Sequence, residues 1–268
     1  MYKMKKLIVC IAMLLVFAFA LTACGSNSAS STDSSSQEVL KVGIDDTYPP
    51  MEFKDDAGEN AGFDIEVAQA LGEKLGMKVE FVPTAWTAIF AALQANKYDC
   101  IISSLSITEE RKETIAYTRP YIANNLVIVV KKGVDDIKSE KDLKDKGVCV
   151  QIGTTADEAC KKFNEETPFK TYKQYDKMTD ALNDLKIGRV DALVSDVVVA
   201  KYFVAKDPDN YTVVNTTLPN EPIAIGCKKS NTAMAEKLDK ALEEIIADGT
   251  LKKISEKWFG EDMTANLQ

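Results

Sequence analysis

The feature that most constrains the fold is an alternation of short, β-rich apolar runs with segments of helical periodicity. The runs are residues 40–44, 79–82, 100–103, 126–130, 148–152, 192–195, 213–215 and 223–226. Most of them are apolar throughout, which is typical of strands that are buried on both faces of a sheet. An alternation of strands and helices predicts an α/β fold with largely parallel sheets.

Helical periodicity is clearest at residues 65–75, 89–93 and 234–245. The first of these segments ends near Gly76 and the last stops at Gly249, and glycine is the usual residue just past the end of a helix. Between the periodic segments, residues 119–121 (RPY) and 218–222 (LPNEP) are the best candidates for connections between two lobes. Two such crossings would build the first lobe from both ends of the chain.

The first 24 residues are an addressing signal and not part of the fold. Three lysines precede an unbroken apolar run at residues 7–20, and the segment LTAC (21–24) follows. A basic start, a short apolar run and a small-residue cut site predict a signal peptide over residues 1–23. An uncleaved membrane anchor is the alternative, although a bilayer requires about 20 apolar residues. The Ser-rich stretch 24–37 has almost nothing to bury, which predicts a flexible tether.

Charge and composition narrow the possible partners and chemistries. The chain has 33 basic and 41 acidic residues, and loss of the three leader lysines gives a mature net charge of −11. Nucleic acids and anionic membranes both require basic patches, so neither is expected as a partner. The absence of histidine excludes Ser-His-Asp and Cys-His enzymes and removes the commonest metal ligand. We expect neither a metal nor a cofactor.

The cysteines of the mature chain do not define a disulfide framework. Cys10 leaves with the signal peptide and Cys24 begins the tether, so the ones left in the folded part are Cys100, Cys149, Cys160 and Cys227. Most of these lie in strand-like apolar runs, where free cysteine behaves as a small hydrophobic residue. Buried thiols and one disulfide are both compatible with the spacing, which cannot decide the pairing.

A set of short motifs occurs in a fixed order along the folded part. The motifs are YPPMEF (48–53), GFDIE (62–66), YD (98–99), SLSITEER (104–111), RPY (119–121), GTT (153–155), GRVDA (188–192) and GT with KWFG (249–260). Together they resemble the family-3 extracellular solute-binding proteins, the polar amino-acid-binding proteins of ABC importers. Residues 101–108 look most like the lysine/arginine/ornithine-binding branch. The segment LTAC resembles a bacterial lipobox, in which Cys24 would carry the lipid.

The resemblance implies a fold and a division into lobes. The expected fold is α/β, the two-lobed type II periplasmic-binding-protein fold, with a ligand cleft between lobes joined by two crossing segments. The first lobe should contain residues 38–123 and 221–268, and the second lobe residues 124–220. Ligand sites at strand ends and domain interfaces also fit the general rule for α/β sheets.

The resemblance also implies a set of ligand-binding residues. They are Asp45, Tyr48, Trp86, Ser103, Ser104, Ser106, Arg111, Gln151, Thr154, Thr155 and Asp196. Arg111 matches the arginine that binds the ligand carboxylate, and its planar fork can hold both oxygens. Asp196 matches the aspartate that binds the ammonium group. Thr154 and Thr155 match the second lobe's anion-binding helix start, and Tyr48 and Trp86 match aromatic positions that flank the ligand side chain.

Each of these residues also has an ordinary structural interpretation. Arg111 stands among charged residues and could be a surface side chain. The Gly-Thr-Thr segment at Thr154 could simply cap a helix, and Asp196 could cap the helix that follows it. Trp86 could be part of a core.

The implied function is a binding protein without catalysis. It would be lipid-anchored at the extracellular face of the membrane, monomeric, and partnered with the permease subunits of an ABC importer. An extracellular dehydratase of prephenate-like acids is a distant alternative, which would require Asp45 or Gln151 to supply or orient a proton donor. We expect a free amino acid as the ligand, arginine or lysine before glutamine or cystine. Gln151 argues against a ligand with an anionic side chain, because some relatives that bind glutamine or acidic amino acids have lysine or arginine there.

Overall fold

The computed structural model describes residues 37–265, so the predicted signal peptide, Cys24 and nearly all of the tether lie outside the described residues. The strands are β1 (Val39–Ile44), β2 (Thr47–Tyr48), β3 (Glu52–Lys54), β4 (Asn60–Ala61), β5 (Lys78–Pro83), β6 (Cys100–Ile101), β7 (Ile115–Ile122), β8 (Asn125–Lys131), β9 (Gly147–Gln151), β10 (Thr171–Tyr175), β11 (Ala192–Asp196), β12 (Tyr211–Asn220) and β13 (Ile223–Lys228). The helices are α2 (Phe63–Leu75), α3 (Trp86–Gln94), α4 (Glu109–Lys112), α5 (Thr155–Glu166), α6 (Met178–Lys186), α7 (Val197–Lys206), α8 (Thr232–Ala247) and α9 (Thr250–Phe259), with a short 3₁₀ helix at Glu140–Leu143.

The strands form two five-stranded sheets that follow the same plan, plus a small three-stranded sheet of β2, β3 and β4. The first sheet has the order β5-β1-β6-β13-β7, and the second has the order β10-β9-β11-β8-β12. In each sheet one strand runs against the other four, namely β13 in the first and β8 in the second. We call the elements around these sheets the first lobe and the second lobe.

The apolar runs of the sequence are all strands in the structure. Those at 126–130, 148–152 and 192–195 became β8, β9 and β11, whose residues are buried almost throughout. This is the burial expected of strands that are covered on both faces. The helical segments are confirmed as α2, α3 and α8, and Gly76 ends α2 with a left-handed φ of 65°.

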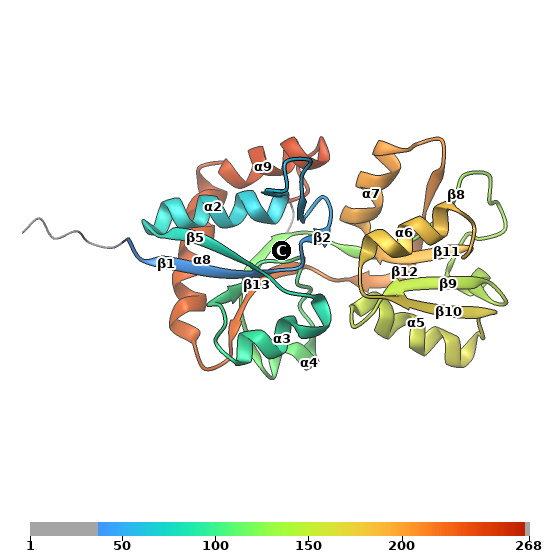
Figure 1. Cartoon of the computed structure of the whole chain (residues 1–268), viewed down its shortest axis with the longest axis horizontal. Coiled ribbons are helices and arrows are strands. Elements are labelled where there is room, and N and C mark those ends of the chain that lie inside the picture. Colours follow the sequence, from blue (N-terminus) through green and yellow to red (C-terminus); the bar gives the residue numbers. More distant parts are fainter. Residues whose placement is uncertain (1–36, 266–268) are drawn as a thin grey trace, which may run out of the picture. The chain divides into compact units, whose positions relative to one another are not determined.

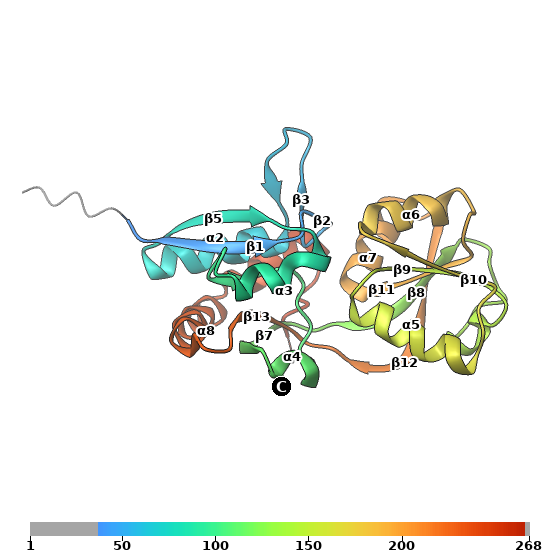
Figure 2. The ribbon, with the colours of Figure 1, turned by 60° about the horizontal axis from the view of Figure 1, so that its bottom comes forward.

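The first connection between the sheets lies beyond the residues predicted for it, and the second is the last part of the predicted segment 218–222. Arg119, Pro120 and Tyr121 belong to the edge strand β7, and residues 218–220 belong to β12. The chain leaves the first sheet after Ile122 and returns to it after Asn220, so residues 119–121 and 218–220 fall inside strands, whereas Glu221 and Pro222 form the second connection. An edge strand accommodates proline because one side of its ladder has no partner. Figure 2 shows the two linking segments, in green and orange. The exact lobe boundaries stay a prediction.

Helices cover both faces of each sheet (Figure 1). In the first lobe, α2 and α8 contribute to one apolar cluster, whereas α3 packs with Ile101 and Leu105 in another. In the second lobe, α5 packs against one face, and α6 and α7 against the other. Neighbouring residues of β8 point to opposite clusters, so this strand is buried from both sides.

All four cysteines of the described chain are free and buried, which favours the interpretation as apolar core residues over a disulfide. Burial raises the pKa of the Cys149 thiol to about 12, so the unreactive thiol form is maintained. Among residues 37–265, none of the helices has the length and apolar character that crossing a membrane would require.

Candidate functional site

One pocket of about 300 Å³ collects the residues that the sequence singled out. It is lined by Asp45, Tyr48, Glu52, Trp86, Ser103, Ser104, Ser106, Arg111, Gln151, Thr154, Thr155 and Asp196. The structure thus places every predicted ligand-binding residue around one cavity and adds Glu52, which the prediction missed. That these side chains contact a ligand stays a prediction.

Strand ends bring the lining residues together. Asp45 follows β1 and Ser103 follows β6, while Gln151 and Asp196 are the last residues of β9 and β11. Parallel strands place their carboxyl ends at the same edge of a sheet, which is where α/β proteins form their ligand sites. The pocket therefore takes side chains from this edge of both sheets.

Arg111 lies in the short helix α4 and turns toward the pocket. Thr108 caps this helix by accepting a hydrogen bond from the Arg111 backbone N–H at 3.1 Å. The guanidinium donates from Nη1 to the Ser106 carbonyl oxygen at 3.2 Å. Its central carbon lies 5.5 Å from the ring centroid of Trp86 and 5.2 Å from that of Phe90, which are cation–π distances. The interpretation as a freely solvated surface arginine is therefore wrong.

Asp196 occupies the cap position of α7, but its side chain does not cap the helix. Its carboxylate accepts a hydrogen bond from the Tyr48 hydroxyl of the first lobe at 2.5 Å, and another from the Asn124 side-chain amide. Burial raises the pKa of the Asp196 carboxyl, and these hydrogen bonds and the charge of Arg111 only partly offset this effect. The side chain is therefore directed at the pocket and not at the helix.

Asp45 and Gln151 connect the two lobes at another point of the pocket. Gln151 donates from Nε2 to Asp45 Oδ2 at 2.7 Å and to the Asp176 carbonyl at 3.1 Å. The other Asp45 oxygen accepts from the Thr47 hydroxyl at 2.7 Å. Burial raises the pKa of Asp45, while these hydrogen bonds lower it by less. Asp45 is thus an acid in a largely dry setting, held in one orientation.

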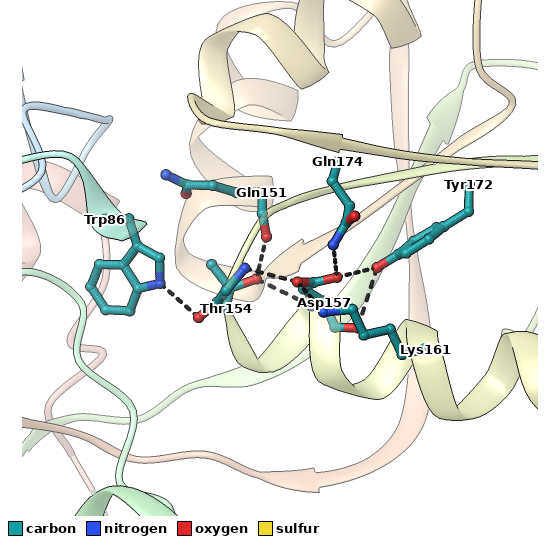
Figure 3. Close-up of polar contacts among 8 residues, drawn as sticks. Trp86, Gln151, Thr154, Asp157, Lys161, Tyr172 and Gln174 are labelled. Carbon is teal, nitrogen blue, oxygen red and sulfur yellow. Dashed lines mark hydrogen bonds and ion pairs between the residues drawn. The ribbon is translucent and has the colours of Figure 1, made fainter. Parts of the chain in front are cut away.

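The start of α5 forms the second lobe's side of the pocket (Figure 3). Thr154 caps the helix, because its hydroxyl accepts from the Asp157 backbone N–H at 3.2 Å and donates to the Gln151 carbonyl at 2.8 Å. The cap interpretation of this threonine is confirmed. Gly153, with a φ of 74°, accepts at its carbonyl oxygen from the Trp86 indole N–H at 2.9 Å. Trp86 is therefore both a core residue and a hydrogen-bonded link between the lobes.

Asp157, in the first turn of α5, holds the turn at Gly153 through hydrogen bonds. The sequence analysis did not identify this residue. One of its oxygens accepts from the Gly153 backbone N–H at 2.8 Å, and Lys161 reaches the same oxygen at 2.9 Å. The other accepts from Tyr172 at 2.5 Å and Gln174 at 2.7 Å. Burial alone would raise the pKa of Asp157, but these hydrogen bonds outweigh it and hold the pKa below its usual range. An acidic residue in the first turn of a helix gives no sign of such burial in the sequence.

The remaining lining residues are held mostly by main-chain geometry. Ser104 has a φ of 44°, in the left-handed region, and its backbone N–H donates to Asp64 at 2.7 Å. Ser106 contributes the carbonyl oxygen that Arg111 contacts. The Thr155 hydroxyl donates to Glu221 Oε2 at 2.6 Å, in the segment that links β12 to β13.

Glu52 is the lining residue that the sequence did not reveal. It is 1% exposed, and its Oε1 accepts from the Ser103 hydroxyl at 2.6 Å. That hydroxyl in turn accepts from the Asp45 backbone N–H at 3.0 Å. Among the described residues that line the pocket, Arg111 is the one cation, whereas Asp45, Glu52 and Asp196 are acids. The one available signal was an acid in the otherwise apolar MEF segment.

Three comparisons place this geometry among known proteins. The L-cystine-binding protein TcyJ of Escherichia coli (strain K12) is 34% identical over 227 residues, covering 84% of each chain. The arginine-binding extracellular protein ArtP of Bacillus subtilis (strain 168) is 34% identical over 243 residues, covering 90% of this chain and 93% of ArtP. A solved structure of an ancestral arginine-binding protein bound to arginine is 44% identical, with a TM-score of 0.79, and the match covers 84% of this chain and 99% of the ancestral chain.

The fold and the family agree with the sequence-based expectation. The chain forms two mixed β-sheets covered by helices and crosses between them twice. This architecture and the structural neighbours confirm the two-lobed type II periplasmic-binding-protein fold. The model of the bacterial extracellular solute-binding proteins, family 3, matches residues 40–261, nearly all of the described chain. This chain is therefore a member of the bacterial extracellular solute-binding proteins, family 3.

Proposed function

We propose that this chain captures a free amino acid and delivers it to the permease subunits of an ABC importer. The observation that carries the proposal is the presence of Arg111 and Asp196 in the lining of one pocket. A free amino acid presents a carboxylate and an ammonium group, and burying either charge without a partner is strongly unfavourable. An arginine and an aspartate that face one cavity are the complementary pair. Relatives named for cystine and arginine binding support the same role.

Capture would proceed by closure of the two lobes around the ligand. Hydrogen bonds that already cross between the lobes support this idea: Tyr48 to Asp196 at 2.5 Å and Trp86 to Gly153 at 2.9 Å. Each of these bonds joins residues at the pocket. A ligand that contacts groups of both lobes binds the closed arrangement more tightly than the open one. It stabilises the closed arrangement by this difference in binding free energy. The role is binding and delivery, without a chemical step.

Arginine or lysine is the proposed ligand, with glutamine or cystine as the alternatives. A zwitterion uses Arg111 and Asp196, which leaves Asp45 for a second positive group at the far end of the ligand. Tyr48 and Trp86 would flank an extended basic side chain and add cation–π attraction. The mature net charge of −11, from 30 basic and 41 acidic residues, would also raise the local concentration of cations.

The proposed location is the extracellular face of the membrane, with the protein held as a monomer by a lipid on Cys24. Members of this family are extracellular or periplasmic, which supports the side of the membrane. The signal peptide and Cys24 lie outside the described residues, so the anchor rests on the leader sequence alone.

A thermal-shift screen of the twenty amino acids and cystine tests this proposal. A ligand that binds only the folded protein stabilises it by about 2.7 kcal/mol at 100 times its dissociation constant. We expect the largest shifts with arginine and lysine. A large shift with glutamine or cystine and none with arginine or lysine would change the ligand but keep the importer role. The absence of any shift with all twenty amino acids and with cystine would contradict the role itself.

A further inference from the structure

Two acids lie together beneath the pocket in the first lobe. Glu52 begins β3 and is 1% exposed, and Asp64 lies in the first turn of α2 and is fully buried. The Asp64 backbone N–H donates to the carbonyl oxygen of Met51, the residue before Glu52, at 2.8 Å, and the two acid side chains bind consecutive residues, so the two acids lie close together. Glu52 Oε2 is buried and has no N–H or O–H donor among the described residues. We call these two residues the buried acid pair.

Each acid of the pair holds one residue of the turn that follows β6. Glu52 Oε1 accepts from the Ser103 hydroxyl at 2.6 Å, and Asp64 Oδ2 accepts from the Ser104 backbone N–H at 2.7 Å. Ser104 has a φ of 44°, a conformation that costs free energy for residues other than glycine. Both serines line the pocket. The acid pair therefore supports a strained turn at the ligand site.

The chemistry of the pair requires a proton. Two carboxylates are both acceptors, so they form a hydrogen bond only when one of them is protonated. Asp64 already accepts from Ser104 and from the Tyr121 hydroxyl at 2.7 Å, whereas Glu52 accepts from Ser103 alone. The acid that accepts more hydrogen bonds from donors is the one whose negative charge is better stabilised. The charge therefore stays on Asp64, and the proton is assigned to Glu52.

The surroundings of the pair favour retention of that proton. Burial, followed by the charge of Asp64, raises the pKa of Glu52 well above its usual value, and burial raises the pKa of Asp64 to about 6. The titratable groups that face the pair are Asp45 at the end of β1, Tyr48 of β2 and Tyr121 of β7, beside which lies Cys100 of β6. None of them supplies a positive charge. Lys257 of α9 approaches α2 too, but it pairs with Glu66.

We propose that Glu52 and Asp64 share one proton, and that this protonated pair positions the Ser103–Ser104 turn for ligand binding. The second half of the proposal rests on the proposed function, whereas the first half does not require any ligand. Loss of the proton would place two negative charges side by side beneath the turn. The two carboxylates would then repel each other, where in the protonated pair a hydrogen bond joins them. Asp64 thereby acts on the ligand through Ser104 and does not contact the ligand itself.

The shared proton makes stability depend on pH with a defined sign. Both acids have a raised pKa in the folded state, so the folded chain binds more protons than the unfolded chain above about pH 4.5, the region where free Glu ionises. The free energy of unfolding therefore falls as the pH rises from about 4.5 through the folded-state pKa of the pair. A Glu52→Gln substitution replaces the protonated acid with a neutral amide of the same shape and removes the part of this dependence that Glu52 contributes.

Thermal unfolding of wild type and Glu52→Gln between pH 4.5 and 7, without ligand, tests the proton. We expect the wild-type melting temperature to fall relative to that of the variant by about 5 °C over this range. Parallel pH profiles would overturn the proposal, as would a failure of this isosteric variant to fold. Because no ligand is present, this result is independent of whether the protein binds amino acids.

Calorimetric titration with the amino acid found in the screen tests the positioning role. In Asp64→Asn, an NH₂ group replaces one of the two carboxylate oxygens and the negative charge is lost, so the Ser104 N–H and the Tyr121 O–H can no longer both donate to a carboxylate. We expect this variant to lose at least about tenfold more affinity than Glu52→Gln, which retains both an acceptor and a donor. Equal affinities of the two variants would remove Asp64 from the positioning of the turn. If Asp64→Asn does not fold, the pH profile of Glu52→Gln still decides the proposal.

Discussion

Replacement of Arg111 by alanine is expected to weaken ligand binding by about 2–5 kcal/mol, or roughly 30-fold to several thousand-fold in the dissociation constant. The guanidinium is the one cation among the described residues that line the pocket, and it is fixed over the rings of Trp86 and Phe90. Its removal would leave the ligand carboxylate buried without a counter-charge. Calorimetric titration of wild type and variant measures the effect directly.

Arg111→Lys is the matched control for this substitution. Lysine retains the positive charge but cannot present two parallel N–H donors to a carboxylate. We expect its affinity to lie between those of wild type and Arg111→Ala. Near-wild-type affinity of the alanine variant would remove Arg111 from the ligand site, and equal losses in both variants would show that the planar fork matters more than the charge.

Asp196→Ala is expected to cause a comparable loss of affinity through the ammonium group of the ligand. The carboxylate accepts from Tyr48 and Asn124, so its removal also leaves two donors at the pocket without their acceptor. The expected cost is about 2–5 kcal/mol of binding free energy. Calorimetric titration again provides the measurement, combined with thermal unfolding of the ligand-free protein.

The same pair of measurements separates the binding role of Asp196 from a helix-capping role. The side chain makes no cap hydrogen bond to α7, so the substitution should affect affinity much more than melting temperature. Asp196→Asn is the matched control, because it retains an acceptor for Tyr48 but loses the charge. A lower melting temperature with unchanged affinity would mean that the aspartate serves the helix and not the ligand.

Much of the fold could be predicted because its strands are apolar throughout. Burial on both faces requires apolar residues at every position, and β8, β9 and β11 show it directly in the sequence. The strands that were missed are those without this pattern. β7 contains Arg119 and Pro120 at the edge of its sheet, and β10, at the edge of the second sheet, is the polar segment TYKQY. Edge strands bury less, so their composition resembles that of loops.

The site residues were predicted from a family resemblance and not from an apolar pattern, and the residues missed are buried acids. Arg111 is the last residue of one ordered motif (104–111) and Asp196 follows another (188–192), so a family resemblance located them although they are far apart in the sequence. Glu52 and Asp157 escaped because their roles depend on burial and on the donors around them. Glu52 needs Ser103 and Asp64 as neighbours, and such contacts across elements have no periodicity in the sequence. An isolated acid between apolar residues is a weak signal, since most acids are solvated.

The most direct test of the central claim is a titration of the protein with its amino acid and with two derivatives of that amino acid. One derivative has its carboxylate converted to an amide, and the other has its ammonium group acetylated. If Arg111 and Asp196 bind these two groups, the parent should bind one molecule per chain and each derivative should bind at least about 30-fold more weakly. Derivatives that bind as tightly as the parent would contradict the claim that this pocket recognises a free amino acid.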